Sequence, residues 1–349
     1  MPYPVKQAPS QRFRVELYLP ELDKVGIKCE IQSFLDQQTW DKLYNKHDFL
    51  SKAWGVAKGF LRRWKVVLFD LSKYQFVFIH REAAPLGPPV FEWMIARVFR
   101  KKYIYDFDDA IWIPNTSESN RVVSWLKSFW KVKHICKWAY KVTGGNEYLC
   151  NYARQFNNNV ICIPTSVDTE NSHNKLKEHS QNGIVIGWTG SHSTAKYIDQ
   201  LIPVLQKFEK ETPFSFLVIS DKPHEPPLKN VIYCPWNEST EVNDLLKMDI
   251  GIMPLENDKW SEGKCGFKLI QYLSLGIPAV ASPVGVNKKI ICHGATGFLC
   301  NDEKEWIEAL GKLAGDATLR KEFGNAGRKF IIDNYSVQEQ SKKLMELFE

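Results

Sequence analysis

Apolar and polar stretches alternate most regularly in the second half of the chain. Short apolar runs, several of them rich in β-branched residues, are separated by segments whose apolar positions recur at helical spacing. The expected strands are 184–188, 215–220, 231–234, 249–253 and 278–282, and the expected helices are about 194–210, 238–247 and 266–275. This alternation predicts a parallel sheet with helices on both faces, which is a doubly wound α/β domain.

The first half repeats the pattern less regularly. Strands are expected at 75–80, 102–106, 142–144 and 160–163, with helices between them, so a second α/β lobe follows. The polar segment 164–182 is rich in Ser, Thr, Asn and Lys, which is typical of a connector. We therefore expect one domain at 1–168, a second at 183–335 and a final amphipathic helix at 336–349 that packs back on the N-terminal domain.

Residues 1–10, with the sequence MPYPVKQAPS, fit this scheme poorly. A doubly wound lobe begins with an apolar strand, whereas this stretch has the prolines and the polarity of the loop that follows such a strand. A helix is expected from about Gln11. Our hypothesis is that the first strand of this lobe is missing from the sequence.

Composition places the chain among folded proteins with more than one core. The 349 residues are 44% hydrophobic and 25% charged, and no apolar run is long enough to cross a membrane or to act as a signal segment. The eight cysteines are scattered without metal-ligand spacing, so we expect neither a disulfide frame nor a cysteine metal site. This usage favours a reducing compartment, and we expect a cytoplasmic protein.

Charge is distributed unevenly along the chain. Residues 1–165 contain 25 basic and 15 acidic residues, a net charge of +10, whereas the remainder contains 21 basic and 25 acidic residues, a net charge of −4. The first part also holds eight of the twelve tryptophans. A basic, tryptophan-rich half indicates contact with anionic lipid or with a phosphate-bearing acceptor, and a nucleic-acid binder is the alternative.

Segment 121–141 is expected to form a basic amphipathic helix. Its apolar positions are Val122, Trp125, Leu126, Phe129, Val132, Cys136 and Ala139, opposed by Lys127, Lys131, Lys133 and Lys137. Such a helix can lie in a lipid interface, or its stripe can face the core of the domain. Because Trp130 and Trp138 lie off the stripe, they favour proximity to an anionic membrane.

The segment 249–287 carries the strongest chemical pattern. After the strand at 249–253, a loop with Gly263, Lys264 and Gly266 leads into a helix. The N-terminus of a helix next to glycines offers backbone N–H groups and a positive dipole end to a diphosphate. Lys264 and Lys268, four residues apart, would add positive charge there, unless both are solvated surface residues.

In this segment the sequence resembles glycosyltransferase family 4, the retaining enzymes of the two-domain GT-B type. The matching positions are Gly266, Phe267, Leu269, Leu273, Gly276, Pro278, Val280, Ala281, Ser282 and Gly285. The family carries two glutamates separated by seven residues, and this chain has Gly263 and Gln271 in their places, with Glu262 next to the first. The resemblance implies that Gln271 contacts the ribose and that Glu262 could take over the contact to the donor sugar.

A second match is the turn IGWTGS at 186–191, followed by Lys196. The resemblance implies that this turn approaches the diphosphate, although many α/β domains have a glycine-rich first turn. The donor-binding residues implied are Gly187, Thr189, Gly190, Ser191, Lys196, Glu262, Gly263, Cys265, Gly266, Phe267 and Gln271.

Three carboxylates follow the strand at 102–106. Asp106, Asp108 and Asp109 crowd like charges, so we expect at least one raised pKa, which suits a base or a grip on sugar hydroxyls. Asp106 and Asp108 are expected to point the same way and Asp109 elsewhere. Acidic triplets also bind Mg²⁺ or Mn²⁺, but the GT-B pattern leads us to expect no essential metal and no cofactor.

Further candidates in the first half lie at the end of the strand at 75–80 or precede it in the chain. His80, Arg81 and Glu82 are candidates for contact with an acceptor or a phosphate. Arg12 and Arg14, at the start of the first expected helix, could reach a phosphate. For each of these residues a buried histidine or a structural ion pair is an equally open interpretation.

The resemblance implies transfer of a sugar from a nucleotide-sugar donor by a front-face mechanism with retention. Lys264, Lys268 and the glycine N–H groups would stabilise the leaving diphosphate, and Asp106, Asp108 and Asp109 would serve the acceptor side. The expected acceptor is a glycan or a polyprenyl-linked glycan in bacterial surface polysaccharide synthesis, at the inner face of the membrane, with no nucleic acid involved. A non-catalytic nucleotide-sugar-binding subunit and a nucleotide-sugar epimerase or dehydrogenase are the alternatives, and the lack of a Gly-x-Gly-x-x-Gly motif counts against a dinucleotide.

Overall fold

The computed structural model describes residues 1–42, 49–114, 128–181 and 183–349. The chain forms two compact units. Unit 1 comprises Met1–Thr165, Gly263–Cys265 and Gln340–Glu349, and unit 2 comprises Ser166–Glu262 and Gly266–Glu339.

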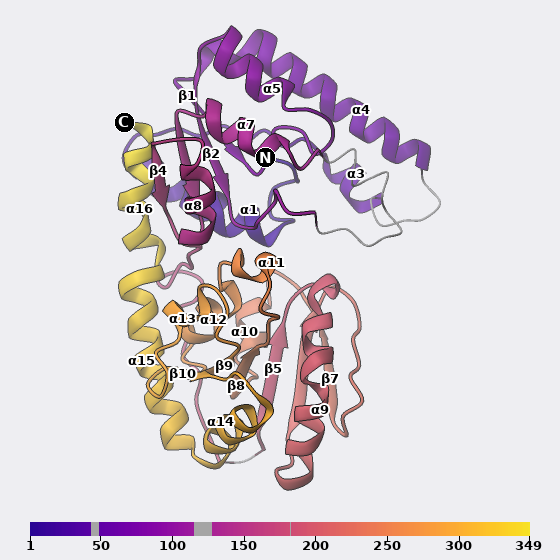
Figure 1. Cartoon of the computed structure of the whole chain (residues 1–349), viewed down its shortest axis with the longest axis vertical. Coiled ribbons are helices and arrows are strands. Elements are labelled where there is room, and N and C mark those ends of the chain that lie inside the picture. The colour runs from indigo at the N-terminus through magenta and orange to yellow at the C-terminus, as the bar shows by residue number, and fades with distance from the viewer. Residues whose placement is uncertain (43–48, 115–127, 182) are drawn as a thin grey trace. The chain divides into compact units, whose positions relative to one another are not determined.

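Unit 1 is built on a parallel sheet in which every strand predicted for the first half is present (Figure 1). Its strands are β1 (Phe76–His80), β2 (Lys102–Phe107), β3 (Lys141–Gly144) and β4 (Val160–Cys162), in the order β1-β2-β3-β4. His80 and Asp106 are register partners near the carboxyl ends of β1 and β2. The two expected polar clusters therefore lie at the same edge of the sheet.

The helices of unit 1 precede, separate and follow these strands. They are α1 (Pro9–Arg14), α2 (Leu19–Lys24), α3 (Gln37–Lys42), α4 (Phe49–Lys65) with its π-helical extension η2 (Val66–Asp70), α5 (Val90–Trp93) with η4 (Met94–Val98), α7 (Lys131–Trp138) and α8 (Glu147–Arg154). Asn146 caps α8 by accepting a hydrogen bond from the backbone N–H of Leu149. Residues 1–8 belong to no strand, and the first helix begins at Pro9, close to the expected start.

An apolar cavity of about 220 Å³ lies along β1. It is lined by four consecutive residues of β1, Phe76–Ile79, and by residues 27–32 among others. Successive side chains of a strand point to opposite faces, so a cavity that touches all four lies along the strand's edge. In the described part of the chain β1 pairs with β2 alone, and the cavity therefore borders the outer edge of the sheet.

Unit 2 contains a parallel sheet of six strands. They are β5 (Val185–Thr189), β6 (Ser215–Ser220), β7 (Val231–Pro235), β8 (Ile250–Met253), β9 (Ala279–Ala281) and β10 (Gly297–Leu299), in the order β10-β9-β8-β5-β6-β7. The strand order reverses between β5 and β8, and open α/β sheets bind ligands at such a point. The sequence did not predict β10, because a three-residue strand that begins with glycine carries little pattern.

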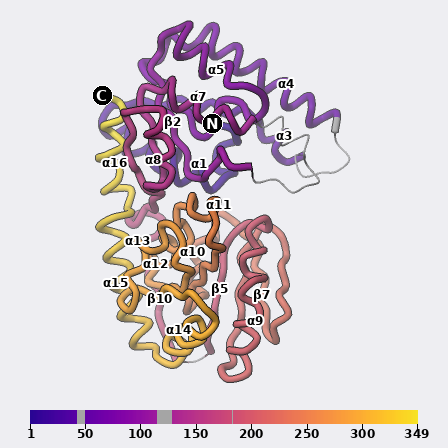
Figure 2. Tube along the Cα trace, viewed as in Figure 1, coloured from indigo at the N-terminus to yellow at the C-terminus, as the bar shows by residue number. Residues whose placement is uncertain are grey.

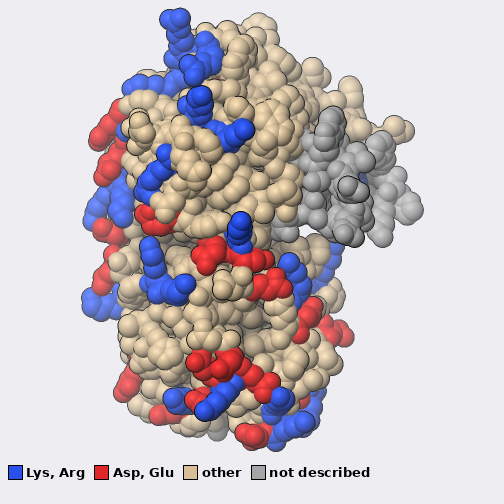
Figure 3. Space-filling model, in the orientation of Figure 1, with Lys and Arg blue, Asp and Glu red and all other residues tan. Residues whose placement is uncertain are grey.

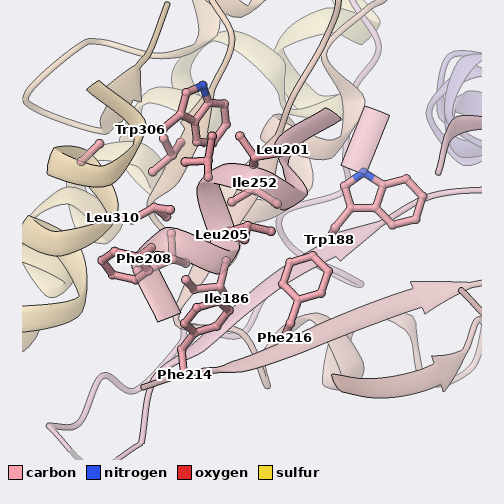
Figure 4. Packing of buried hydrophobic residues seen from close by; sticks show 14 of the residues in the cluster. Ile186, Trp188, Leu201, Leu205, Phe208, Phe214, Phe216, Ile252, Trp306 and Leu310 are labelled. Carbon is pink, nitrogen blue, oxygen red and sulfur yellow. The ribbon is translucent and has the colours of Figure 1, made fainter. Parts of the chain in front are cut away.

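The helices of unit 2 cover both faces of this sheet. They are η6 (His192–Thr194), α9 (Lys196–Glu211), α10 (Glu241–Leu245), α11 (Lys259–Glu262), α12 (Phe267–Ser274), α13 (Asn287–Ile290), α14 (Glu303–Gly315) and α15 (Ala317–Tyr335). Ile186 and Trp188 point to the same face because strand side chains alternate, and α9 and α14 cover that face with Leu205 and Trp306 (Figure 4). On the opposite face Gly251 lies against the ring of Tyr272 from α12.

The chain ends with α16 (Val337–Met345) and the turn η7 (Glu346–Phe348). Within unit 1, Tyr140 donates a hydrogen bond to the carbonyl of Glu349 at 3.0 Å, and the rings of Phe76 and Phe348 lie 5.8 Å apart. The last residues thus pack on the sheet of unit 1, as the tube trace shows (Figure 2). This confirms that the final helix returns to the N-terminal domain.

The expected amphipathic helix at 121–141 is only partly described, because residues 115–127 lie outside the described residues. In α7, Val132, Ile135 and Cys136 are buried, so the apolar stripe of the described part faces the core. Lys131 was expected on the solvent side, and this was wrong. Its ammonium group is buried, 2.7 Å from Glu82, because an ion pair with that carboxylate compensates its desolvation. No helix in the described ranges is long and apolar enough to cross a membrane.

Candidate active site

Helix α12 is fixed over the carboxyl end of β5, at the reversal of strand order in unit 2. Tyr272 accepts a hydrogen bond from the backbone N–H of Thr189 at 3.0 Å. One turn earlier on α12, Lys268 Nζ lies 5.4 Å from the ring centroid of Trp188. Lys268 is therefore held at the end of β5, where an open α/β sheet binds its ligand.

Gly266 shapes the N-terminus of α12. Its φ of 67° is in the left-handed region, and a Cβ atom there would lie 2.2 Å from Ile290 Cδ1. Glycine also leaves the N-cap position without a side chain that could occupy the first backbone N–H groups. The positive end of α12 and Lys268 in its first turn together form a place suited to a diphosphate.

Replacing Gly266 with alanine is expected to destabilise unit 2 by about 1–3 kcal/mol and to weaken donor binding at least tenfold. The added methyl group clashes with Ile290, and the left-handed backbone disfavours alanine, so the first turn of α12 must move. Thermal unfolding and donor titration of the variant measure both effects. Gly315→Ala is the matched control, because a Cβ there meets nothing within 4 Å. Equal donor affinity in wild type and Gly266→Ala would contradict this role.

The turn after β5 contains the second group of expected donor residues. Gly190 donates a backbone hydrogen bond to the carbonyl of Ile219 at 3.0 Å, and a Cβ on Gly190 would lie 2.5 Å from the Trp188 ring. Ser191 and Lys196 are exposed, whereas Thr189 is buried. Gly187 was expected to admit a phosphate, but it lies within β5, where a Cβ would be 2.3 Å from Met248, so its small size serves packing.

Gln271, at the position where the resemblance places a glutamate, is hydrogen-bonded to a carboxylate from another helix. Its Nε2 donates to Glu241 Oε1 at 3.2 Å, and Trp236 Nε1 donates to the same oxygen at 3.0 Å. Glu241 and Gln271 are both buried, at 7% and 2% exposure. A carboxylate from α10 is therefore one hydrogen bond away from Gln271. Neither Glu241 nor Trp236 was predicted from the sequence, although Trp236 directly follows the carboxyl end of β7.

Glu262 is the last residue of α11, and the loop after β9 contacts it. A Cβ on Gly285 would lie 3.0 Å from the carbonyl oxygen of Glu262. The next residues, Gly263–Cys265, are part of unit 1. There Lys264 Nζ lies 3.6 Å from Asp109 Oδ1, and the Cys265 thiol donates to the carbonyl of Asp108 at 3.0 Å.

In unit 1 the carboxyl ends of β1 and β2 hold a buried hydrogen-bonded chain. Ser10 Oγ lies 2.8 Å from His80 Nε2, and His80 Nδ1 lies 2.6 Å from Asp106 Oδ2. Because an ionised carboxylate can only accept, Nδ1 carries the hydrogen. Arg14 forms an ion pair with Asp106 and donates to the carbonyl of Ile163. The side chains of Arg14, His80 and Asp106 are almost completely buried.

These contacts correct two expectations about Asp106 and Arg14. Burial would raise the pKa of Asp106, but the charge of Arg14 and the hydrogen bond from His80 lower it below its ordinary value, so crowding does not raise it. Arg14 was expected to reach a phosphate, but its guanidinium is enclosed and bonded to Asp106. Both side chains hold α1 against β2 and His80.

A second, more open cluster centres on Arg81. Its guanidinium lies 2.8 Å from Asp108 and 2.5 Å from Asp109, and its Nε donates to Ser10 at 3.1 Å. Asp109 was expected to point away from Asp108, but both converge on Arg81. The pKa of Asp108 is also lowered, because the charge of Arg81 outweighs the effect of burial. Arg81 has a φ of 60°, and the ion pairs hold this strained backbone.

The remaining candidates of unit 1 lie apart from these contacts or have other partners. Glu82 pairs with Lys131 at 2.7 Å, which is the structural ion pair left open by the sequence. The guanidinium carbon of Arg12 lies 4.9 Å from the ring centroid of Phe13. Among the described residues, no three His, Cys, Asp or Glu side chains form a group that could hold a metal ion. All eight cysteines are free thiols.

Comparisons with known proteins agree with this architecture. A search of curated protein sequences finds no match. The structure is similar to HepE from Anabaena, solved in complex with UDP-glucose, with a TM-score of 0.62, 15% identity and coverage of 95% of this chain and 88% of that one. A glycosyltransferase from Rickettsia africae matches with a TM-score of 0.61, 16% identity and coverage of 94% and 86%. Sucrose-phosphate synthase from Thermosynechococcus elongatus matches with a TM-score of 0.61, 12% identity and coverage of 83% and 78%.

Two parallel-sheet units, together with these matches over most of the chain, define the GT-B fold. Residues 183–316, which contain the α12 site, match the sequence model of the family described as glycosyl transferases group 1. The matched residues lie almost entirely in unit 2.

Proposed function

We propose that the protein transfers a sugar from a uridine diphosphate sugar to a hydroxyl group of a glycan or lipid-linked glycan, with retention of configuration. The observation that carries this proposal is the N-terminus of α12, with Lys268 at the end of β5. HepE, which has the same fold, was solved with UDP-glucose, and this supports uridine diphosphate as the first donor class to test. Residues 183–335 would hold the donor and residues 1–168 the acceptor.

In the proposed reaction the acceptor hydroxyl attacks the anomeric carbon from the side that the diphosphate leaves. The bond between the anomeric carbon and the phosphate oxygen breaks, the bond to the acceptor oxygen forms, and the acceptor proton passes to the departing phosphate oxygen. Lys268, Lys264 and the first N–H groups of α12 would stabilise the negative charge of the diphosphate as it leaves. Positioning of the two substrates supplies the rest of the rate enhancement.

On the acceptor side we assign the open cluster to sugar hydroxyls. Asp108 and Asp109, held by Arg81, keep side-chain exposures of 11% and 23%, whereas Asp106 is 1% exposed. Carboxylates fixed by an arginine can accept hydrogen bonds from hydroxyl groups without changing their charge. The buried chain of Ser10, His80 and Asp106 would position this cluster through the hydrogen bond from Arg81 to Ser10.

On the donor side we assign Gln271 and Glu241 to the ribose. The amide and the carboxylate lie one hydrogen bond apart, so the pair offers the acceptor oxygens that ribose hydroxyls need. Glu262 would take the contact to the donor sugar, next to the loop of Gly285. A role in bacterial surface polysaccharide synthesis at the inner face of the membrane remains part of the proposal.

Among UDP, GDP, ADP and CMP, we expect UDP to raise the melting temperature of the protein most. A ligand that binds only the folded state stabilises that state by about 2.7 kcal/mol at 100 times its Kd, which corresponds to a rise of a few degrees. Differential scanning fluorimetry measures this shift. The purified protein with a UDP-sugar should then hydrolyse or transfer the sugar, and NMR of the product should show the donor's anomeric configuration. Binding without turnover would favour the non-catalytic subunit, and an inverted product would contradict the mechanism.

A further inference from the structure

Helix α4 presents an apolar stripe to solvent. Leu50, Trp54, Leu61 and Leu68, on α4 and its extension η2, are 84%, 60%, 63% and 47% exposed. The spacings of four and seven residues keep Leu50, Trp54 and Leu61 on one side of α4, which has 3.6 residues per turn, and Leu68 continues the exposed apolar surface on η2. We refer to these four residues as the α4 stripe. Exposure of one large apolar side chain is ordinary, but four along one helix and its extension mark an interaction surface.

The opposite side of α4 makes the contacts that fold unit 1. A Cβ on Gly59 would lie 2.7 Å from the ring of Phe34, and a Cβ on Gly55 would lie 2.3 Å from Thr39, so the helix approaches these residues closely. Arg63, on the same side, is buried. The α4 stripe is therefore separate from the packed side, and its substitution leaves the packing of unit 1 intact.

The charge of α4 is of a single sign. The helix carries Lys52, Lys58, Arg62, Arg63 and Lys65, and residues 49–65 include no Asp or Glu. Lys58 Nζ lies 5.8 Å from the ring centroid of Trp54, so a cation accompanies the stripe itself. Lysine side chains can lie along apolar surface and extend their ammonium groups to anionic headgroups.

A neighbouring segment extends the surface. The rings of Trp64 and Phe91 lie 5.2 Å apart and join α4 to α5. After Phe91, Trp93 and Phe99 are 45% and 40% exposed, and Arg97, Arg100 and Lys101 lie in the same stretch of chain. In Figure 3 the part of the face where Figure 1 draws α4 and α5 is tan and blue. Apolar and cationic side chains thus occur together on α4 and in residues 93–101.

We propose that the α4 stripe docks on the surface of an anionic lipid bilayer. Aliphatic side chains, tryptophan and lysine on one helix face are the combination that lies in the interface of such a bilayer. A second copy of the chain is a poorer occupant, because a symmetric pairing of α4 would bring its cations face to face. The inference rests on the proposed function only in that it locates the membrane contact of an enzyme with a lipid-linked acceptor.

Flotation with vesicles tests this surface. At low salt the full-length protein should float with vesicles of equal parts phosphatidylglycerol and phosphatidylcholine, and much less with phosphatidylcholine alone. The double variant Trp54→Ser/Leu61→Ser should lose at least about tenfold in vesicle affinity, because buried apolar area drives insertion. Lys58→Glu/Lys65→Glu should lose at least about tenfold for anionic vesicles only, because each cation is attracted to the anionic surface.

Ile332→Ser is the matched control, since Ile332 is a 41% exposed apolar residue on α15 of unit 2, and it should float like wild type. Failure of the wild type to float on anionic vesicles at low salt overturns the proposal, and so does equal flotation of the double variants. A dimer in solution that Trp54→Ser/Leu61→Ser dissociates, without vesicle binding, assigns the surface to a second copy instead. Donor hydrolysis without vesicles should be unchanged in every variant, and this assay tests the proposed function separately.

Discussion

Replacing Lys268 with alanine is expected to lower kcat by about 100- to 1000-fold, because a preorganised charge that stabilises a leaving group contributes on this scale. The side chain is held at the end of β5 by the ring of Trp188, 5.4 Å from its Nζ, so no solvent reorganisation is needed when the diphosphate departs. Initial rates at saturating donor measure kcat directly.

The matched control is Lys312→Ala. Lys312 lies on α14 of the same unit, and its Nζ is 5.7 Å from the ring centroid of Phe298, so it makes the same type of contact away from the end of β5. Its removal should leave kcat within about twofold, because surface charges far from the ligand are screened. A Lys268→Ala enzyme that turns over like the Lys312→Ala enzyme would refute the role assigned to α12.

Asp106→Asn is expected to destabilise unit 1 by about 3–5 kcal/mol, since it leaves the buried charge of Arg14 without a partner. The Arg14 and Asp106 side chains are 2% and 1% exposed. Urea unfolding followed by tryptophan fluorescence measures the loss. Glu147→Gln is the control, because Glu147 and Arg154 form an ion pair at 2.7 Å with side chains 45% and 42% exposed, and such pairs contribute about 1 kcal/mol or less.

The same substitution should change how stability depends on pH. The pKa of Asp106 is lower in the folded protein than the ordinary value of about 3.9 in the unfolded chain. As the pH falls below about 4, the unfolded state takes up the proton first, so the free energy of unfolding decreases. Asp106→Asn should unfold with a weaker dependence on pH in this acidic range. Identical acid unfolding profiles of wild type and variant would argue against the lowered pKa.

The parallel sheets could be predicted because their strands are buried apolar runs with polar residues at the ends. Residues 215–220 form a strand with the predicted bounds, and β8 begins one residue after the prediction. β10 was not predicted because a strand of three residues is too short to show an alternation of apolar and polar positions. The position of the glycine turn before α12 was also predictable, since its residue types follow from the backbone that the helix start needs.

The partners of charged residues could not be predicted from the local pattern. Arg14 is 92 positions from Asp106, and no spacing along the chain indicates that the two form an ion pair. The sequence therefore suggested crowded carboxylates with a raised pKa, whereas distant arginines lower the pKa of Asp106 and Asp108. The α4 stripe was missed for a related reason, because helical spacing alone does not tell an outward apolar side from an inward one.

The hydrogen bond between Gln271 and Glu241 shows that a carboxylate can lie beside a motif position without being supplied by the residue at that position. A motif search scores Gln271 as the loss of an acid, while the folded chain returns a carboxylate to the same neighbourhood from a helix thirty positions earlier. In the proposed donor site the ligand would therefore still meet one carboxylate beside the amide. A survey that classifies homologues by the residue at a single motif position would overlook this carboxylate. A comparison of where charged groups lie in the folded structures would find it.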